Sequence, residues 1–136
     1  MWLFVEHSDF TTVPDVLVGM DLTYLSLGFN QIQTVPTALF TNPSLTLVAM
    51  QGNPISMLPE VPAQNRTALD LLILDSTNLS VLPSWMDHSF LVTTKVYLGN
   101  TPYCDALGAA NQTAETINHQ LLCRKNDDCQ RLHKIA

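Results

Sequence analysis

Charged side chains are scarce in this sequence. Asp, Glu, Lys and Arg make up 13% of its 136 residues, compared with roughly 25% in a typical soluble domain. Residues 1–94 contain eight acidic residues and a single basic one, Arg66, and the net charge of the chain is -6. This balance argues against a nucleic-acid partner. Four basic residues could form a small basic patch, but the nearby Asp127 and Asp128 favour a solvated face: Arg124, Lys125, Arg131 and Lys134.

A long hydrophobic run is also missing. A membrane-spanning helix needs ~18 to 20 apolar residues in succession, and Asp70 and Asp75 bound the richest run, 71–74. The opening residues MWLFVE have neither the basic start nor the roughly 7 to 15 apolar residues of a signal peptide. We therefore predict no transmembrane helix within this chain. Because it starts directly on an expected strand, we interpret the chain as a fragment or an incomplete product.

Hydrophobic residues, by contrast, make up 46% of the chain, enough for one domain to bury a core. They recur with a fixed spacing. Residues 22–36, LTYLSLGFNQIQTVP, fit the pattern L-x-x-L-x-L-x-x-N-x-I-x-x-V-P without a gap. The pattern recurs over 45–59 and, with threonine in place of asparagine, over 69–83. A degenerate copy opens the chain at Leu3, and a fifth copy begins at Val96.

One polar position marks each copy, at intervals of 22, 23, 24 and 24 residues: Ser8, Asn30, Asn53, Thr77 and Thr101. Short side chains that form hydrogen bonds suit a turn where the chain leaves a strand and neighbouring backbones stack. The alternation before this position predicts a short strand with one face buried. One copy cannot bury its apolar side alone, whereas stacked copies can. The expected core includes Leu25, Leu27, Val48, Leu72 and Leu74 from the strands, and Ile32, Val35, Leu39 and Phe40 from a return segment.

These copies resemble the leucine-rich repeat family over roughly residues 1–104, with three copies matching at seven positions each. The resemblance implies an α/β fold, a solenoid with a parallel sheet on its concave face, irregular or short helical returns on its convex face and a small helical C-terminal cap. It divides the chain into repeats at 1–103, about four plus a truncated final one, and a cysteine-containing cap at 104–136. An unrelated α/β domain with accidental leucine spacing is the alternative.

The C-terminal part carries all three cysteines. Residues 96–104, VYLGNTPYC, resemble the start of the cysteine-rich cap of extracellular leucine-rich repeat proteins, although the family's C-x-C pair is absent. An amphipathic helix predicted over 113–122 would cover the apolar layer of the last repeat. An odd number allows at most one internal bridge among Cys104, Cys123 and Cys129. The pairing stays open, although Cys104 with Cys123 would join the end of this helix to the last repeat.

A metal site is the alternative use of these cysteines. His119, Cys123, Cys129 and His133 are residues of zinc-ligand type. The C-x5-C spacing is wider than that of the usual zinc knuckle, and no second cluster accompanies it. We therefore favour a disulfide and predict no metal or other cofactor.

Three sequons for N-glycosylation fall in predicted loops, at Asn65, Asn78 and Asn111. Together with the few charges and the disulfide-type cap, they favour an extracellular or secretory-pathway location. A cytoplasmic location is the alternative, and it would require reduced cysteines and unused sequons.

The residues between the inward leucines should point out of the concave sheet. Exposed apolar residues in a row commonly mark an interaction surface, and aromatic side chains are preferred anchors. We expect ligand binding, or alternatively self-association or burial by missing repeats, at these residues: Trp2, Phe4, Tyr24, Leu47, Leu71, Ile73 and Tyr97.

The sequence contains no recognisable catalytic motif. The four histidines lie in separate contexts, none spaced to join a nucleophile and an orienting carboxylate. Ser-x-x-Lys, G-x-S-x-G and P-loop motifs are absent. We therefore predict a non-catalytic module that recognises a protein or peptide, as a fragment of a secreted or receptor-type leucine-rich repeat ectodomain. The alternatives are a purely structural scaffold and an intracellular leucine-rich repeat adaptor.

Overall fold

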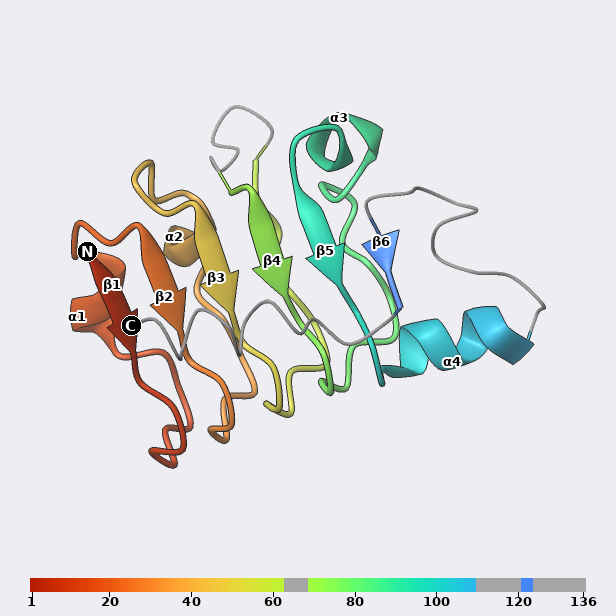
Figure 1. Cartoon of the computed structure of the whole chain (residues 1–136), viewed down its shortest axis with the longest axis horizontal. Coiled ribbons are helices and arrows are strands. Elements are labelled where there is room, and N and C mark those ends of the chain that lie inside the picture. The colour runs from red at the N-terminus through yellow and green to blue at the C-terminus, as the bar shows by residue number, and fades with distance from the viewer. Residues whose placement is uncertain (63–68, 110–120, 124–136) are drawn as a thin grey trace.

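The computed structural model describes residues 1–62, 69–109 and 121–123. Six strands in these ranges form one sheet, in which neighbours are parallel and the order in space follows the order in the sequence (Figure 1). The strands are β1 (Trp2–Phe4), β2 (Tyr24–Ser26), β3 (Leu47–Ala49), β4 (Leu71–Ile73), β5 (Lys95–Tyr97) and β6 (Leu121–Leu122). With its short helices, this sheet confirms the α/β class.

Short helices lie in three of the segments that connect the strands: α1 (Asp15–Val18), α2 (Thr37–Phe40) and α3 (His88–Leu91). Pro14 and Pro36 immediately precede α1 and α2 with φ of -58° and -71°, values that suit the entrance to a helix. Asp87 caps α3, because its Oδ1 accepts a hydrogen bond of 3.0 Å from the Phe90 amide. Each helix is one turn long, so its stability must come from packing on the sheet.

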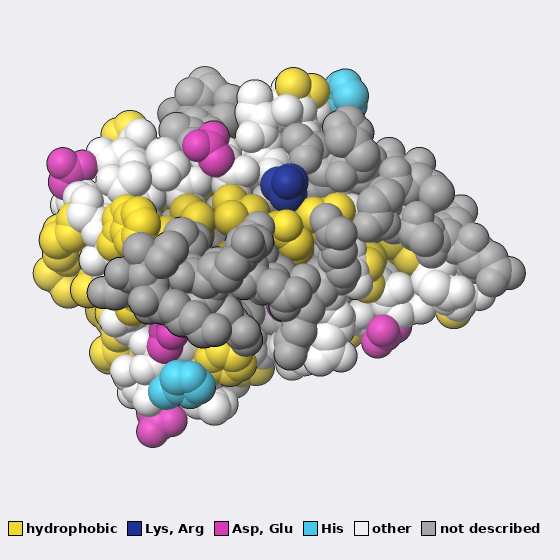
Figure 2. All heavy atoms as spheres, viewed as in Figure 1, with side chains coloured by type: hydrophobic (Ala, Val, Ile, Leu, Met, Phe, Trp, Pro, Cys, Tyr) yellow, Lys and Arg dark blue, Asp and Glu magenta, His cyan; other side chains and the backbone are white. Residues whose placement is uncertain are grey.

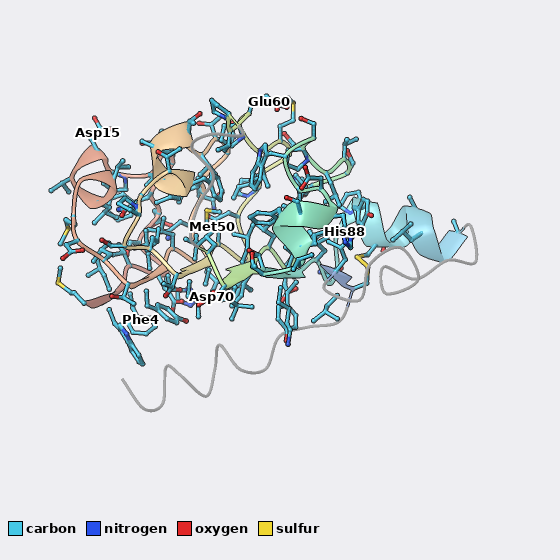
Figure 3. The ribbon with its side chains drawn as sticks, turned by 90° about the horizontal axis from the view of Figure 1, so that it is seen from above. Phe4, Asp15, Met50, Glu60, Asp70 and His88 are labelled. Atoms are coloured by element: carbon cyan, nitrogen blue, oxygen red, sulfur yellow. A yellow bond between two sulfur atoms is a disulfide. The ribbon has the colours of Figure 1, made fainter. Side chains whose placement is uncertain are left out.

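The core lies between the sheet and these connecting segments. One row of strand side chains runs through it in register: Leu3, Leu25, Val48, Leu72, Val96 and Leu121. Figure 3 shows Met50 on the same side of the sheet as α1 and α2, and Phe4 on the opposite side. The expected strand residues Leu25, Leu27, Val48, Leu72 and Leu74 are all 0% exposed, which confirms the inward face of the pattern. The return residues expected in the core are buried as well: Ile32, Val35, Leu39 and Phe40.

The polar position of the pattern closes the turn after each strand, as its spacing predicts. The Asn30 amide nitrogen donates to Val5 O (2.8 Å) and Leu27 O (2.9 Å), and its Oδ1 accepts from the Ser8 amide (2.9 Å). Asn53 repeats this arrangement one strand further on. Thr77, by contrast, donates to Leu74 O within its own turn. An asparagine therefore joins two successive turns, because it both donates and accepts.

The residue before the polar position adopts a left-handed backbone in every turn: His7 (φ 54°), Phe29 (59°), Gly52 (71°), Ser76 (57°) and Asn100 (56°). Only one of these residues is glycine, so the other turns hold a conformation that L-residues rarely adopt. At Gly52 the glycine also makes room for the neighbouring turn, because an added Cβ would lie 2.5 Å from Cδ1 of the Phe29 ring. The five copies of the sequence pattern therefore share this turn conformation.

The C-terminal part differs from the expected helix over 113–122. Leu121 and Leu122 form β6, pair with Val96 and Tyr97 of β5, and are buried. The end of the predicted helix is therefore wrong, because these leucines fill the open edge of β5, while 113–120 lie outside the described residues. Earlier in this region, residues that were not predicted to be helical form α4 (Pro102–Ala109), which spans the boundary expected between residues 103 and 104.

Candidate binding face

The side of the sheet opposite the core, here called the outer face, carries two rows of side chains in register. The first row is Trp2, Tyr24, Leu47, Leu71 and Lys95, and the second is Phe4, Ser26, Ala49, Ile73, Tyr97 and Leu122. The structure thus brings together all seven ligand-binding residues predicted from the sequence. Figure 2 shows the hydrophobic side chains as a band across the strands.

Aromatic rings form the β1 and β2 end of this band. The Tyr24 ring centre lies 5.5 Å from that of Trp2 and 5.1 Å from that of Phe4, in tilted geometry. Such offset contacts stabilise an aromatic cluster. Trp2 remains 48% exposed, whereas Tyr24 is buried.

Aliphatic side chains and Tyr97 continue the band over β3 to β6. Ala49, Ile73, Tyr97 and Leu122 form a second hydrophobic cluster, separate from the main core, and Leu47 and Leu71 pack against it. Ile73 is 1% exposed and Tyr97 5% exposed. The sequence pattern predicted exposed rows, so burial at Ile73 and Tyr97 is a difference from that expectation. Within the described residues, Trp2 and Lys95 are the exposed members of the two rows.

A polar edge runs beside the band at the carboxyl ends of the strands. It consists of Glu6, Gly28, Gln51, Asp75 and Gly99, each two residues beyond the second row. The Glu6 carboxylate accepts a hydrogen bond from the Ser26 hydroxyl, and the Asp75 Oδ1 accepts one of 2.9 Å from the Gly99 amide. A Cβ at Gly28 would lie 2.7 Å from Gln51 Nε2, so the glycine leaves room for neighbouring polar side chains. The outer face therefore combines an apolar band with carboxylates.

Cys104 and Cys123 form a disulfide that joins α4 to the residue after β6, with 5.6 Å between their Cα atoms. This is one of the pairings that the sequence left open. The disulfide engages one member of the possible zinc set, Cys123, and the others, His119, Cys129 and His133, lie outside the described residues. Within those residues, no group of three or more His, Cys, Asp or Glu side chains could hold a metal ion. Burial of the Tyr103 hydroxyl, in α4, raises its pKa above the ordinary tyrosine value.

The remaining predicted positions fall in separate places. Asn78 is exposed in the turn after β4, whereas the sequons at Asn65 and Asn111 lie outside the described residues. His7 stacks on Phe29 with 4.8 Å between ring centres, and His88 lies in α3. Across 1–62, 69–109 and 121–123, no helix has the length and apolar character needed to cross a membrane.

Sequence reasoning missed an aromatic cluster on the opposite side of the molecule. Trp85 lies 5.4 Å from Phe40 and 5.1 Å from Phe90, and its indole nitrogen donates to Pro59 O at 2.8 Å. Beside it, residues 56–58, Glu60 and residues 80–84 line a groove. Met57 and Val81 are 76% and 72% exposed there. The repeat pattern ends at the proline of each copy, so it gave no signal for Trp85 or Phe90, which lie beyond that proline.

No protein-family model, curated protein or solved structure matches this chain. The candidate site therefore rests on the geometry of the sheet. It defines an α/β protein whose parallel sheet carries a continuous apolar face.

Proposed function

We propose that this chain is a non-catalytic recognition module of the leucine-rich repeat type, which binds a protein or peptide through its outer face. One observation carries the proposal: the apolar band stays in register across six strands. A contiguous apolar surface beside polar groups is typical of interaction sites. The aromatic residues Trp2, Phe4 and Tyr24 would supply anchors at one end.

The solenoid architecture is part of this proposal. The strands follow one another in sequence order, and Asn30 and Asn53 join successive turns. These features support stacked repeats whose outer face is the concave side and whose helices lie on the convex side. An extracellular or secretory-pathway location is proposed with it, supported by the Cys104–Cys123 pair and the exposed Asn78.

The test compares two double variants that change the net charge equally. In Trp2→Glu with Leu71→Glu, both substitutions lie on the outer face. In Met57→Glu with Val81→Glu, both lie on the opposite side, at strongly exposed positions. Trp2 and Leu71 are preferred to Tyr24, because Tyr24 is buried between two rings and a charge there would disturb folding.

Peptides are selected from a displayed random library on the wild-type chain, and their affinities are then measured for both variants by titration. We expect the outer-face variant to weaken binding by about 2 kcal/mol, or roughly 30-fold, and the control to leave it unchanged. Circular dichroism checks that both variants fold. Equal affinity for both folded variants would remove the site from the outer face.

A further inference from the structure

Some side chains of the outer face are buried and others are exposed, which suggests that part of this face is covered. Ile73 and Tyr97 are almost fully buried, although their side chains lie on the side of the sheet opposite the core. The described contacts of this cluster are with side chains of the same face. A sheet buries both of its faces only when a second layer packs on each. A segment that packs over β3 to β6 would complete that layer.

The chain leaves the sheet beside this cluster. Leu122 belongs to it, and the next residue, Cys123, is fixed to α4 through Cys104. Because β6 is parallel to the other strands, Cys123 stands at their carboxyl ends, next to the polar edge. Whatever follows Cys123 therefore starts from a fixed point at one corner of the outer face.

The thirteen residues 124–136 are long enough to cross the face. They span roughly 40 Å when extended, whereas five steps between neighbouring strands cover roughly 24 Å. About seven extended residues therefore reach from β6 to β1. Arg131 and Leu132 lie beyond that number and can reach the Trp2, Phe4 and Tyr24 rings.

The composition of this segment complements the face. Residues 124–136 contain four basic and two acidic residues, whereas residues 1–94 carry a net charge of -7. Glu6 and Asp75 place carboxylates along the polar edge. Near its end, apolar Leu132 directly follows basic Arg131, and apolar Ile135 directly follows basic Lys134. The segment can thus offer apolar groups to the band and cations to the carboxylates.

We propose that residues 124–136 dock across the outer face as an intramolecular occupant. The segment then covers the surface that a partner would use, and a partner must displace it. Only this competition with a partner rests on the proposed function, because the docking itself needs no external ligand. The segment is a tethered competitor, so it raises the apparent Kd of every partner by the same factor, the reciprocal of the fraction of chains in which the segment is undocked.

Cys129 provides the probe, because it lies six residues beyond the disulfide-bonded Cys123. Extended, six residues reach about 20 Å, enough to bring its thiol over β4 or β3. In the full-length chain, Leu71→Cys places a thiol on the outer face. Val81→Cys places one on the opposite side at a more exposed position. Both variants are oxidised slowly at low concentration, and the disulfide to Cys129 is quantified by non-reducing peptide mapping.

We expect the bond from Cys129 to form at least ~10-fold faster in Leu71→Cys than in Val81→Cys, because docking raises the effective concentration at one face only. Each rate is normalised to the reaction of the same engineered thiol with a small soluble disulfide. Near-ultraviolet circular dichroism verifies folding, and Leu47→Cys on β3 replaces Leu71→Cys if that variant does not fold. Equal normalised rates would overturn the proposal. Cross-linking between chains that grows with concentration would overturn it too and would assign the face to a second copy.

Two double variants of residues 131 and 134, one that reverses their charge and one that preserves it, test whether docking depends on these cations. Added to Leu71→Cys, Arg131→Glu with Lys134→Glu should lower the cross-linking rate several-fold, whereas Arg131→Lys with Lys134→Arg should preserve it. The same rate in both would overturn the electrostatic part of the docking. The peptide titration reports separately on the proposed function: fast cross-linking with no outer-face dependence of peptide binding would retain the docking and reject the function.

Discussion

Asn53 shows how one side chain can connect two turns. Its Oδ1 accepts from the Ile32 amide at 3.1 Å, and its Nδ2 donates to Leu27 O at 2.9 Å and Met50 O at 3.0 Å. Leu27 and Ile32 belong to the previous sequence copy. Since Asn53 is buried, water cannot replace these bonds after truncation.

Asn53→Ala should therefore lower the free energy of unfolding by about 3 kcal/mol, because buried backbone groups of two turns lose their partner. Thr77→Ala is the matched control at the equivalent position, where the described bond to Leu74 O stays within one turn. It should cost about 1 kcal/mol. Urea titrations followed by circular dichroism measure both values. If the two variants lost equal stability, the bonds between turns would contribute nothing measurable.

Residue patterns predicted the inward face and the turn position for clear reasons. Leu25 and Leu72 repeat at equivalent places because they fill the core, and Asn30 and Asn53 repeat because each bonds backbone groups of two turns. The outer face was predicted in position but not in burial. Alternation gives the side to which Ile73 and Tyr97 point, whereas their exposure depends on contacts from distant parts of the chain.

At the scale of elements, the C-terminal region diverged most from the sequence-based expectation. The helical spacing of 113–122 suggested one helix, yet Leu121 and Leu122 extend the sheet. Two adjacent leucines fit the spacing of a helix and that of a strand equally well. Here the unpaired edge of β5 favours the strand, because its backbone groups need partners. That edge comes from tertiary structure, so the sequence offered no local signal for β6.

We expect the Cys104–Cys123 disulfide to stabilise β6 against dissociation from the sheet. It links residues separated by 19 positions, and a loop of this length contributes about 3 kcal/mol through its effect on the unfolded chain. Cys123→Ser should lower the stability by about that amount. Cys129→Ser should leave it unchanged, because Cys129 is not part of this bond. Urea titrations with and without a reductant measure the effect, and an equal loss in both variants would indicate a different pairing in solution.

The whole molecule is a linear series of strands, since each one pairs only with those next to it in sequence among the described residues. Stability in such an arrangement comes from contacts between neighbours, so it need not be uniform. β1 has one neighbouring strand, and Leu3 and Val5 are half-buried, whereas the equivalent Leu25 and Leu27 are fully buried. The amino-terminal end should therefore open before the centre.

Hydrogen exchange can measure this gradient at equivalent backbone amides. The amides of Val5, Met50 and Leu98 each donate to the next strand or its end, at 2.8, 2.8 and 2.7 Å. We expect the Val5 amide to exchange at least ~10-fold faster than that of Met50, which corresponds to about 1.4 kcal/mol less protection. Reduction of the Cys104–Cys123 bond should accelerate exchange at Leu98 and leave Met50 unchanged, because β6 is two strands beyond β4, the partner of the Met50 amide. The same protection at all three amides, both before and after reduction, would show instead that the sheet opens as one cooperative unit.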